Sequence, residues 1–441
     1  MYEVIIVGSG PAGLFAALNL VKEGKDSILI IDKNPFPSGG MLNDCKLNLS
    51  TEIGMDLDEL KISKDKAKEY IEFIDKTFLK FGAPDQIFGD DQTLYKEWDE
   101  RAKRNDVEFI PAIQRHIGTD LSKNVIKNFR DFLEKKGVKF KLSTEIVDIK
   151  IKDKFYNLET SKGESFEGKY VILAPGRSGS KWLREISNRL NISYSNGKKI
   201  DVGIRVEMRN ESYPITDVIY DPKFKIKSKY GNILRTFCTN PGGRVTLERY
   251  DDFTLVNGDA LKSSKTENTN FALLDTIILT EPLTDPFVYG RLIAISTNIL
   301  GNGRPIIQRV GDFLDEKRSK EETFFDKTRW FDRVKPTLNV GKLVTPGDIR
   351  MSYPYKIIKE LKEALIKLNK IFGNTILKEE NIIYAPEVKF YSLVYNTTEK
   401  LETNVKNIFV AGDGAGKSRG IVGAAISGII ASEGILKNEN S

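Results

Sequence analysis

Three glycines near the start of the chain have a spacing that suits them to bind phosphate. The segment GSGPAG places Gly8, Gly10 and Gly13 directly after the apolar run YEVIIV and before LFAALNLVKEG. At such a junction the first glycine permits a tight turn, the second lets the backbone approach a pyrophosphate, and the third allows a helix to pack closely on a strand. The N–H groups at the positive end of the helix then face the anion. We therefore expect this segment to bind a dinucleotide, with Pro11 and Ala12 in the same turn.

An acidic residue lies where a dinucleotide-binding site needs one. Asp32 ends the next apolar run, SILIID, about 20 residues after Gly13, where a carboxylate can accept hydrogen bonds from ribose hydroxyls. A glycine-rich turn that merely opens a helix is the alternative, but the flanking strands and the acid count against it. NAD and FAD bind to the same arrangement, so this motif leaves the identity of the dinucleotide open. The adjacent Lys33 is a further candidate contact.

A second glycine-rich segment, AGDGAGKSRG at residues 411–420, raises a competing interpretation. It fits the loose pattern in which a small residue, four others and then Gly-Lys-Ser form a loop that cradles a triphosphate. Under that interpretation Lys417 and Ser418 would bind phosphate and magnesium. Such a loop also needs a parallel sheet downstream with an acidic strand end, and only residues 421–441 follow in this sequence. We therefore expect no ATP site here.

The same segment, together with the residues before it, resembles a flavin fingerprint. TNVKNIFVAGD, which begins at Thr403, has the form of a threonine, four residues, a hydrophobic strand and Gly-Asp. This resembles the second flavin motif of the glutathione-reductase-like FAD enzymes. The resemblance implies that Asp413 contacts the ribityl chain or the adjacent phosphate, and that the positive end of the following helix stabilises the reduced flavin. The implied cofactor contacts are Gly412, Asp413, Arg419, Gly420, Ile421 and Val422, and Arg419 is also a candidate partner of an anionic substrate.

The middle of the chain agrees with this resemblance. The apolar run KYVILAPG occupies the place of the family's strand that ends in Ala-Thr-Gly, with Pro175 in place of the threonine. Val147 matches the position whose backbone reads the adenine. The loop after the acid-bearing strand runs along FAD in such folds, although ordinary loop capping explains its polar residues equally well. The resemblance thus implies further FAD contacts at Gly40, Asn43, Val147, Ala174 and Gly176.

Six further strings resemble one branch of this superfamily, the FAD-dependent dehydrogenases of uncharacterised physiological role, similar in architecture to aromatic hydroxylases and geranylgeranyl reductases. The strings are SGGMLNDCKLNL, RHIGTD, TFCTNPGG, NTNFALL, YAPEVKFYS and AGDGAGKSRGIVGAA. The resemblance extends from Tyr2 to about Gly434. The chain has no second GxGxxG, because GNGRPI carries Ile306 where the third glycine belongs. We therefore expect no dedicated NAD(P)H domain, and hydride would come from transiently bound NAD(P)H or from the substrate.

Four side chains are candidates for the reacting groups, and each also has a structural interpretation. Cys238 in TFCTNPGG could face the flavin, but a small buried hydrophobe is the commoner role. His116, the only histidine, could exchange a proton near neutral pH or make a structural hydrogen bond. Lys389 and Tyr391 lie in EVKFYS, where strand alternation would turn one of them to solvent. Cys45 and Cys238 each stand alone, so disulfide reduction, which needs paired cysteines, is not expected.

The composition is that of an ordinary globular protein. The chain has 441 residues, 40% of them hydrophobic, enough for roughly two or three structural units. Its 68 basic and 62 acidic residues are interleaved, which favours solvated helix faces over a nucleic-acid surface. There is no run of about 18 apolar residues that would predict a membrane span, and the lone cysteines and the initial strand indicate the cytoplasm. We expect a small-molecule substrate, no nucleic-acid partner and no metal, and the oligomeric state stays open.

The candidate residues must be positioned by alternating strands and helices. The opening reads strand, helix, strand, and a charged helix follows with Ser63 as its N-cap. Three short segments, VKFKLS, EIVDIKIKD and KFYNLETSKG, suggest an antiparallel meander, and period-two strands dominate residues 201–330. We predict an α/β protein with a Rossmann-like FAD-binding domain at residues 1–200 and 385–441, which carries a helical insertion at about 50–100. An inserted α+β substrate domain with an antiparallel sheet would occupy residues 201–384.

These expectations converge on an FAD-dependent oxidoreductase that transfers hydride between flavin and an unidentified small molecule, with NAD(P)H as a possible co-substrate. One alternative is a reductase of prenyl-lipid double bonds, which a broad apolar cavity in the second domain would favour. The other is a protein that holds FAD while it modifies tRNA, which a contiguous basic face would favour. The interleaved charges count against the tRNA alternative.

Overall fold

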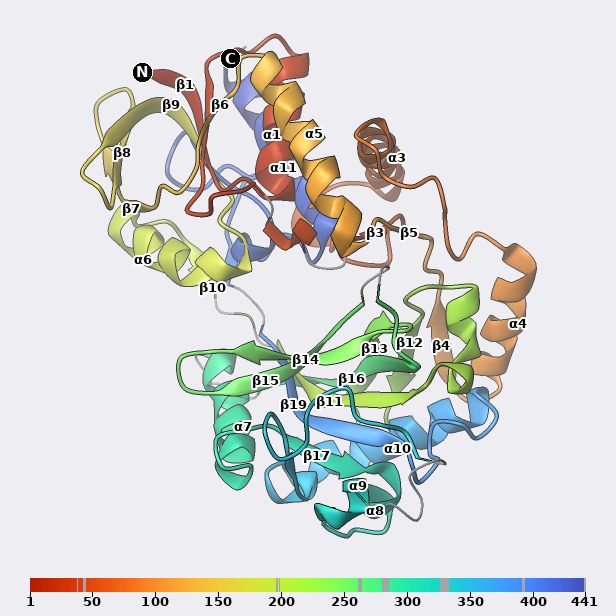
Figure 1. Cartoon of the computed structure of the whole chain (residues 1–441). Coiled ribbons are helices and arrows are strands. Elements are labelled where there is room, and N and C mark those ends of the chain that lie inside the picture. The colour runs from red at the N-terminus through yellow and green to blue at the C-terminus, as the bar shows by residue number, and fades with distance from the viewer. Residues whose placement is uncertain are drawn as a thin grey trace. The chain divides into compact units, whose positions relative to one another are not determined.

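The computed structural model of the chain divides into two compact units (Figure 1). The structure describes residues 1–439 apart from 38, 43–44, 196, 198, 261–263, 280–284, 326–332 and 391–392. The first unit comprises Met1–Gln86, Arg115–Asn196 and Ser392–Ser441, and the second comprises Ile87–Gln114 and Gly197–Tyr391. Each unit is therefore assembled from segments that are far apart in the sequence.

A parallel sheet forms the centre of the first unit, because its strands are apolar runs that are buried on both faces. Its parallel strands lie in the order β6 (Lys139–Lys141), β2 (Ile28–Ile31), β1 (Tyr2–Val7), β9 (Ser165–Leu173) and β21 (Ile408–Val410). The N-terminal part of β9 also pairs with β8 (Tyr156–Thr160), which pairs with β7 (Ile146–Ile151), both antiparallel. Strands β2 and β9 flank β1 on opposite sides, which is the strand order of a Rossmann-like fold.

Successive residues of the parallel strands turn to opposite faces of the sheet, and both faces are covered. On β1, Val4 and Ile6 belong to one hydrophobic core, whereas Ile5 and Val7 belong to another. The first core is completed by α1 (Pro11–Lys22), α3 (Lys64–Lys80), α5 (Thr119–Lys135) and α11 (Ile421–Glu439). The second is completed by α6 (Ser180–Leu190) with β7 and β8.

Two helices of the first unit confirm or refine the sequence analysis. In α3 the predicted cap is present, because Ser63 Oγ accepts a hydrogen bond from the N–H of Lys66 at 3.2 Å. Among the described residues, α11 is the one helix long and apolar enough to cross a membrane, but 78% of its apolar window Ile421–Asn438 is buried inside the protein. It packs so closely on α1 that a Cβ on Gly428 would lie 2.0 Å from the carbonyl oxygen of Ala12. Helix α11 is therefore a core helix.

A mostly antiparallel sheet forms the second unit, as the period-two strands predict. Its strand order is β18 (Thr345–Pro346), β17 (Ile306–Arg309), β19 (Ile382–Lys389), β11 (Lys199–Arg209), β16 (Asn268–Ile278), β13 (Ile233–Asn240), β12 (Lys223–Lys227) and β4 (Val107–Ile110). Helices α7 (Pro286–Leu300) and α10 (Tyr355–Ile371) cover one face of this sheet (Figure 1). The hairpin of β14 (Arg244–Arg249) and β15 (Thr254–Asp259) covers part of the other face.

The domain boundaries expected from the sequence need two corrections, and the expected meander needs a third. Strand β4 pairs with β12, so residues 87–114, expected partly in the helical insertion and partly in the FAD-binding domain itself, belong to the second unit. Strand β19 lies inside the second sheet, so that unit extends to about residue 391. Strand β6 pairs in parallel with β2 and is not part of the meander. Strands β4 and β6 are short edge strands, whereas β19 is an internal strand. All three have partners that are distant in the sequence, and no local pattern identifies the partner.

The remaining described elements are mostly short. Two small sheets pair β3 (Lys46–Asn48) with β5 (Gln114–His116) and β10 (Tyr194–Ser195) with β20 (Val394–Tyr395). The short helices are α2 (Leu57–Leu60), α8 (Val310–Leu314) and α9 (Glu322–Phe325), and the longer α4 (Gln92–Lys103) precedes β4. Single turns of 3₁₀ helix include η1 (Gly39–Leu42), η2 (Arg177–Gly179) and η7 (Asp413–Ala415), and each of these three follows the C-terminal end of a strand of the parallel sheet.

Candidate dinucleotide-binding site

Four predicted segments meet at one edge of the parallel sheet. The register aligns Val7 of β1 with Ile31 of β2 and with Leu173 of β9, and Leu173 in turn with Val410 of β21. The residues that follow these four strand ends are Gly8, Asp32, Ala174 and Ala411, and each opens a candidate motif. Because β2 and β9 leave β1 on opposite sides, this edge is the topological switch point at which α/β sheets bind their ligands.

The three glycines of GSGPAG have different structural reasons to be glycine. Gly8 has a φ of +109°, and a Cβ there would lie 2.1 Å from the carbonyl oxygen of Ala174. A Cβ on Gly13 would lie 2.0 Å from the carbonyl oxygen of Gly8. In contrast, a Cβ on Gly10 would meet, among the described residues, only the backbone of Gly39, at an ordinary contact distance of 3.4 Å. The fold therefore requires Gly8 and Gly13, whereas the fold alone does not require Gly10.

Helix α1 begins directly at this turn. Gly10 is its N-cap, and Pro11, which lacks an N–H, is its first residue, a position that suits the fixed φ of proline. Ala12 is buried in the first turn. The N–H groups of a first helical turn have no intrahelical acceptor, and the positive end of the helix dipole adds to their attraction for an anion. The N-terminus of α1 thus has the chemistry of a phosphate site.

Asp32 is buried and fully hydrogen-bonded at the end of β2. One of its oxygens accepts hydrogen bonds from the backbone N–H and the hydroxyl of Ser9, at 2.8 and 2.5 Å. The other accepts from the backbone N–H and the side-chain amide of Asn34, at 2.9 and 3.0 Å. The sequence analysis missed both Ser9 and Asn34. The available signal was their position, since Ser9 lies between two of the motif glycines and Asn34 lies two residues after Asp32. Lys33, which lies between Asp32 and Asn34, is exposed.

Asp413 lies at the turn between β21 and α11. Its carboxylate accepts hydrogen bonds from Ser418 Oγ at 2.7 Å and from the N–H of Gly420 at 3.2 Å, and Arg177 Nε lies 3.5 Å away. Burial raises the pKa of Asp413 above its usual value, while the Arg177 charge and the two hydrogen bonds act in the opposite direction. Ser418 therefore binds the acid of the flavin-like motif, and Arg177, which the sequence analysis did not select, follows Gly176 directly.

Lys417 has an interaction that differs from that of a triphosphate-binding lysine. Only 2% of its side chain is exposed, and Nζ lies 3.2 Å from a carboxylate oxygen of Glu59. Burial lowers the pKa of Lys417, and the Glu59 charge partly counteracts this. Since the amine points to Glu59, this geometry agrees with the expectation that AGDGAGKS is not an ATP loop.

The glycines on the rim of this edge leave open space. A Cβ on Gly40, Gly176 or Gly420 would have no heavy atom of the described residues within 4 Å. Gly176 and Gly420 also have positive φ values, +65° and +129°, that disfavour other residues. The neighbouring candidate residues Ile421, Val422 and Ala174 are buried. Gly412 is also buried, and its N–H donates a hydrogen bond to Ser427 Oγ at 2.8 Å. Arg419 is exposed, and its backbone N–H donates a hydrogen bond to the carbonyl oxygen of Gly54.

Two other cofactor candidates give less support. Val147 lies on β7 with 40% of its side chain exposed, and its carbonyl oxygen accepts a hydrogen bond from Arg189 at 3.0 Å. Adenine recognition through this carbonyl would have to share it with Arg189. Asn43 lies outside the described residues.

The candidate reacting residues are divided between the units. His116 ends β5 in the first unit, and only 3% of the residue is exposed. Cys238 and Lys389 lie in the second unit, on β13 and β19. Tyr391 lies outside the described residues. Within the second unit, the structure groups Cys238 with Lys389.

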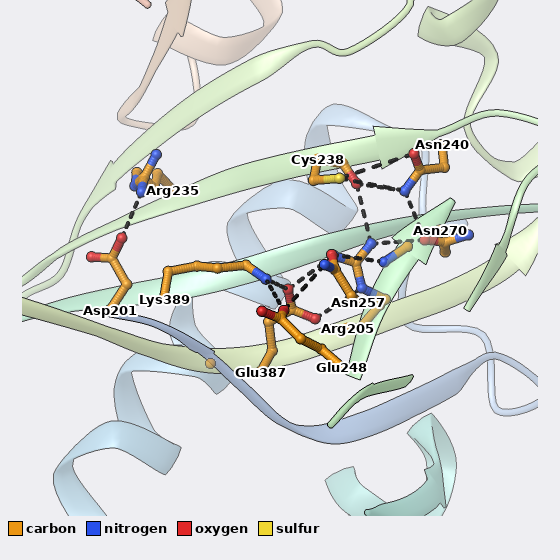
Figure 2. A network of polar contacts seen from close by, with 12 residues as sticks. Asp201, Arg205, Arg235, Cys238, Asn240, Glu248, Asn257, Asn270, Glu387 and Lys389 are labelled. Carbon is orange, nitrogen blue, oxygen red and sulfur yellow. Dashed lines mark hydrogen bonds and ion pairs between the residues drawn. The ribbon is translucent and has the colours of Figure 1, made fainter. Parts of the chain in front are cut away.

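Cys238 and Lys389 border a buried polar network that the sequence analysis missed (Figure 2). Arg205 is fully buried and makes two hydrogen bonds of 2.9 Å to the carboxylate of Glu387. It also donates to the carbonyl oxygen of Cys238 at 3.1 Å and to Asn270 Oδ1 at 2.8 Å. Lys389 Nζ lies 2.8 Å from Glu387. Burial would raise the pKa of Glu387, but the charges of Arg205 and Lys389 hold it below its usual value.

Among the described residues, no group of three or more His, Cys, Asp or Glu side chains could hold a metal ion. The polar network described above is built from ion pairs and amides. Its signal in the sequence was the alternation of KIDVGIRVEMR, which puts Asp201, Arg205 and Glu207 on one face of β11. All three are fully buried, so this alternation does not mark a solvent-exposed face.

One comparison with known proteins covers part of this site. Residues 6–45 match the family model of the NAD(P)-binding Rossmann-like domain, a range that includes GSGPAG and Asp32. An uncharacterized protein of Clostridium beijerinckii is 24% identical in an alignment of 464 positions, gaps included. The alignment covers 98% of this chain and 80% of that protein. Glycine oxidase from Geobacillus kaustophilus is similar in structure, with a TM-score of 0.44 and 13% identity over 99% of this chain and 95% of that chain. L-proline dehydrogenase from P. horikoshii has a TM-score of 0.46 and 12% identity over 99% and 94%. The first unit thus contains a Rossmann-like domain, and the matched range includes Gly8 and Asp32, two of the four residues that follow the strand ends at this edge.

Proposed function

We propose that this protein is an FAD-dependent oxidoreductase, in which the first unit binds FAD and a small molecule exchanges hydride with it. The observation that carries the proposal is Gly10. Gly8 and Gly13 are explained by contacts inside the protein, but a side chain at Gly10 would meet only an ordinary contact. A glycine that the fold does not need, at the N-terminus of a helix and at a topological switch point, is explained by the close approach of a ligand's pyrophosphate.

FAD is favoured over NAD by the second glycine-rich segment. Both dinucleotides fit the turn before α1, and the matched family model is named for NAD(P). This chain adds the turn at Asp413 and the N-terminus of α11 at the same edge of the sheet. Two helix N-termini and two carboxylates suit a ligand with a pyrophosphate, a ribose and a third, electron-accepting group. The resemblance to the flavin fingerprint assigns the α11 terminus to that third group.

The residues of the first unit would bind and orient the cofactor. FAD supplies the capacity to accept or donate hydride. The first turn of α1 would hold its pyrophosphate, and Asp32 would accept hydrogen bonds from a ribose. Asp413 would bind the ribityl chain or the neighbouring phosphate, while the N–H groups near Gly420 would stabilise negative charge. NAD(P)H is a candidate electron donor.

The cofactor can be identified directly. The purified protein should be yellow, and denaturation should release FAD and not FMN, as determined by chromatography. Under anaerobic conditions the flavin should bleach when the protein meets its reductant, for which NADH, NADPH and a panel of metabolites are the probes. Release of FMN, or a protein that stays colourless after reconstitution with FAD, would overturn the proposal.

A matched pair of glycine variants tests the observation that carries the proposal. Gly10→Ala should lower FAD affinity by about tenfold or more, yet change the unfolding free energy of the FAD-free protein by only about 1 kcal/mol or less. Gly13→Ala should destabilise the FAD-free protein itself, by about 1–3 kcal/mol or more, because its Cβ would collide with the Gly8 carbonyl. Unchanged FAD affinity in Gly10→Ala would show that no ligand approaches this turn.

A further inference from the structure

Helix α7 of the second unit is apolar on both of its sides. Its inner side is buried on the sheet, and a Cβ on Gly290 would lie only 2.3 Å from Ile200 Cδ1. Arg291 is the one charged residue of this helix, whose 15 residues are all described. A helix that is apolar all round is ordinarily buried all round. The outer side of α7 nevertheless carries five large apolar residues that are 39–72% exposed, namely Phe287, Val288, Leu292, Ile299 and Leu300.

Helix α10 shows that the sheet itself does not demand such a surface. It covers the same face of the sheet as α7 (Figure 1), and its inner side is equally apolar. Its outer side, however, is rich in lysine, and only Glu360 of its seven charged residues is buried. The apolar outer side of α7 is therefore a property of this helix and needs a separate explanation.

An aromatic cluster extends the apolar surface beyond the N-terminal end of α7. The ring centroid of Phe287 lies 4.4 Å from that of Phe390, which lies 5.9 Å from that of Tyr250 in the turn between β14 and β15. Tyr250 is 38% exposed. We call the resulting surface the α7 surface, and it consists of Tyr250, Phe287, Val288, Leu292, Ile299 and Leu300.

The α7 surface has the area that a homodimer requires. Its six large side chains are on average about half exposed, so together they present on the order of 500 Å². A stable interface of standard size buries about 800 Å² on each partner, and about 65% of a homodimer interface is apolar, which is again about 500 Å². A contiguous apolar surface of this size marks an interaction site.

The exposed positions are also arranged symmetrically about the middle of α7, between Ile293 and Ala294. Residues 287–288 and 299–300 are exposed at equal distances from this point along the sequence, and residues 291–292 and the partly exposed 295–296 are likewise equidistant. A two-fold axis at this point would pair α7 with an antiparallel copy, with Val288 opposite Ile299 and Leu292 opposite Ile295. Self-complementarity of this kind is what the interface of a two-fold dimer needs.

The single charge on the helix does not prevent this pairing. Arg291 forms an ion pair with Asp252, which lies in the same turn as Tyr250. In the antiparallel arrangement Arg291 would lie opposite Ser296 of the second copy, and not opposite the other Arg291. Its charge therefore stays paired at the edge of the interface, as in the polar rim of a typical dimer.

The charges at the two ends of α7 favour a second copy over a lipid surface. The N-terminal end is bordered by acids, because Asp251 and Asp252 follow Tyr250 and Asp285 is the N-cap. Arg304 lies at the C-terminal end, where a Cβ on Gly301 would lie 1.9 Å from its carbonyl oxygen. Antiparallel pairing places the acidic end of one helix beside the Arg304 end of the other. Anionic lipid headgroups would instead be repelled by the acids.

We propose that the α7 surface is the interface of a homodimer, in which α7 of one protomer packs antiparallel on α7 of the other about a two-fold axis. Leu292 lies at the centre of this interface, and the aromatic cluster of each protomer covers the C-terminal end of the opposite helix. The inference goes beyond the proposed function and does not depend on the cofactor.

Sedimentation equilibrium of the full chain measures the association directly. The wild type should have twice the mass of Leu292→Glu at the same micromolar concentration. Association of Leu292→Glu should be at least about a hundredfold weaker, because each interface would hold two unpaired carboxylates at its centre. Leu292 is 57% exposed, so the substitution leaves the core of the protomer intact, and circular dichroism checks the fold. Ile299→Glu, at a position that is 72% exposed, is a second disrupting variant.

Ile366→Glu is the matched control variant. Ile366 lies on α10 outside the α7 surface and is 45% exposed, and this variant should keep the mass of the wild type. A wild type that is monomeric up to its solubility limit would overturn the proposal, and so would a mass that neither Leu292→Glu nor Ile299→Glu lowers. A monomer that binds phosphatidylcholine vesicles through Leu292 would show that lipid occupies the surface instead.

Cysteine cross-linking tests the antiparallel register. An oxidised mixture of Val288→Cys and Ile299→Cys should form a disulfide-linked dimer that contains one chain of each. Val288→Cys alone should not, because its two copies would lie about 16 Å apart along the helix axis, well beyond the reach of a disulfide. The wild type measures the background from Cys45 and Cys238. A dimer in which Val288→Cys alone cross-links as well as the mixture would contradict the two-fold arrangement.

Discussion

Ser9 donates two hydrogen bonds to a single carboxylate oxygen of Asp32, one from its backbone N–H at 2.8 Å and one from its hydroxyl at 2.5 Å. Asn34 donates two more to the other oxygen. Since a carboxylate offers about four lone-pair sites, these described donors saturate Asp32. The two backbone donors are fixed by the turns that carry them. A ribose hydroxyl can therefore reach Asp32 only by replacing the Ser9 hydroxyl or the Asn34 amide.

The first prediction concerns Asp32. Asp32→Ala should weaken FAD binding by about ten- to hundredfold, because a hydrogen bond to a charged group contributes about 1.5–3 kcal/mol. It should also destabilise the FAD-free protein by about 1–3 kcal/mol, because the Ser9 N–H loses its acceptor. FAD titration of the apo-protein, followed by quenching of flavin fluorescence, measures the affinity, and thermal unfolding measures the stability.

Ser9→Ala is the control for Asp32→Ala. It keeps the backbone hydrogen bond and removes only a donor that competes with the ribose. FAD affinity in this variant should be equal to that of the wild type or higher. Weaker FAD binding would show that the Ser9 hydroxyl contacts the cofactor and does not compete with it.

The second prediction separates the flavin interpretation of residues 411–420 from the triphosphate interpretation. Asp413→Ala should lower FAD affinity by about ten- to hundredfold, since it removes a carboxylate at the N-terminus of α11 that also accepts from the N–H of Gly420. Lys417→Met preserves packing and leaves Glu59 with 38% of its side chain exposed to water. It should leave FAD affinity unchanged. The same titration measures both variants.

ATP provides the opposing arm of this experiment. In the wild type, ATP should bind no better than a simple anion such as sulfate. Micromolar ATP affinity that disappears in Lys417→Met would show that the loop binds triphosphate. Wild-type FAD affinity in Asp413→Ala would instead refute the role of Asp413 in holding the cofactor.

The dinucleotide-binding edge could be predicted because each of its residues has a local physical role. Gly8 has a positive φ, Gly13 lies against the Gly8 carbonyl, and Asp32 directly follows its strand. Sequence-local signals of this kind also identified α3 through its Ser63 cap and the parallel strand β9 through its apolar run. What a residue must do inside its own turn or element can be inferred from its neighbours in the sequence.

The second unit was harder to predict because its important contacts are distant in sequence. Alternating charges on a strand ordinarily indicate a solvent-exposed face, yet Arg205 is fully buried. Its partner Glu387 lies on β19, and Asn257 of the β14–β15 hairpin covers it. Gly258 leaves the space for this network, because a Cβ there would lie 2.3 Å from the Arg205 guanidinium. Nothing within KIDVGIRVEMR identifies these partners, and the same reason explains why β4 was assigned to the wrong unit.

The last prediction concerns Asp275 on β16, which lies beside Glu360 of α10 with both side chains fully buried. Burial raises the pKa of Asp275 to about 8, and the neighbouring carboxyl of Glu360 contributes, while Asn232 and Lys356 oppose the shift. The folded protein thus holds a proton that the unfolded chain, with an ordinary aspartate pKa of about 3.9, releases in the acid range. A group whose pKa is raised in the folded state stabilises the fold most when the pH is below the pKa of the unfolded chain. This contribution to the unfolding free energy is lost as the pH rises from about 4 to about 8.

Asp275→Asn preserves the shape of the side chain and removes the titration. The unfolding free energy of the wild type should therefore fall relative to Asp275→Asn as the pH rises through this window, by at most about 1.4 kcal/mol per pH unit, and the difference should level off above about pH 8. Glu363 lies on α10, the helix that carries Glu360, but its side chain is partly exposed. The Glu363→Gln variant should therefore show no such trend relative to the wild type. Urea unfolding at several pH values measures the three proteins. Parallel curves for the wild type and Asp275→Asn between pH 4 and 8 would show that Asp275 does not hold a proton in the fold, because a buried aspartate that stays charged over the whole range contributes no pH dependence.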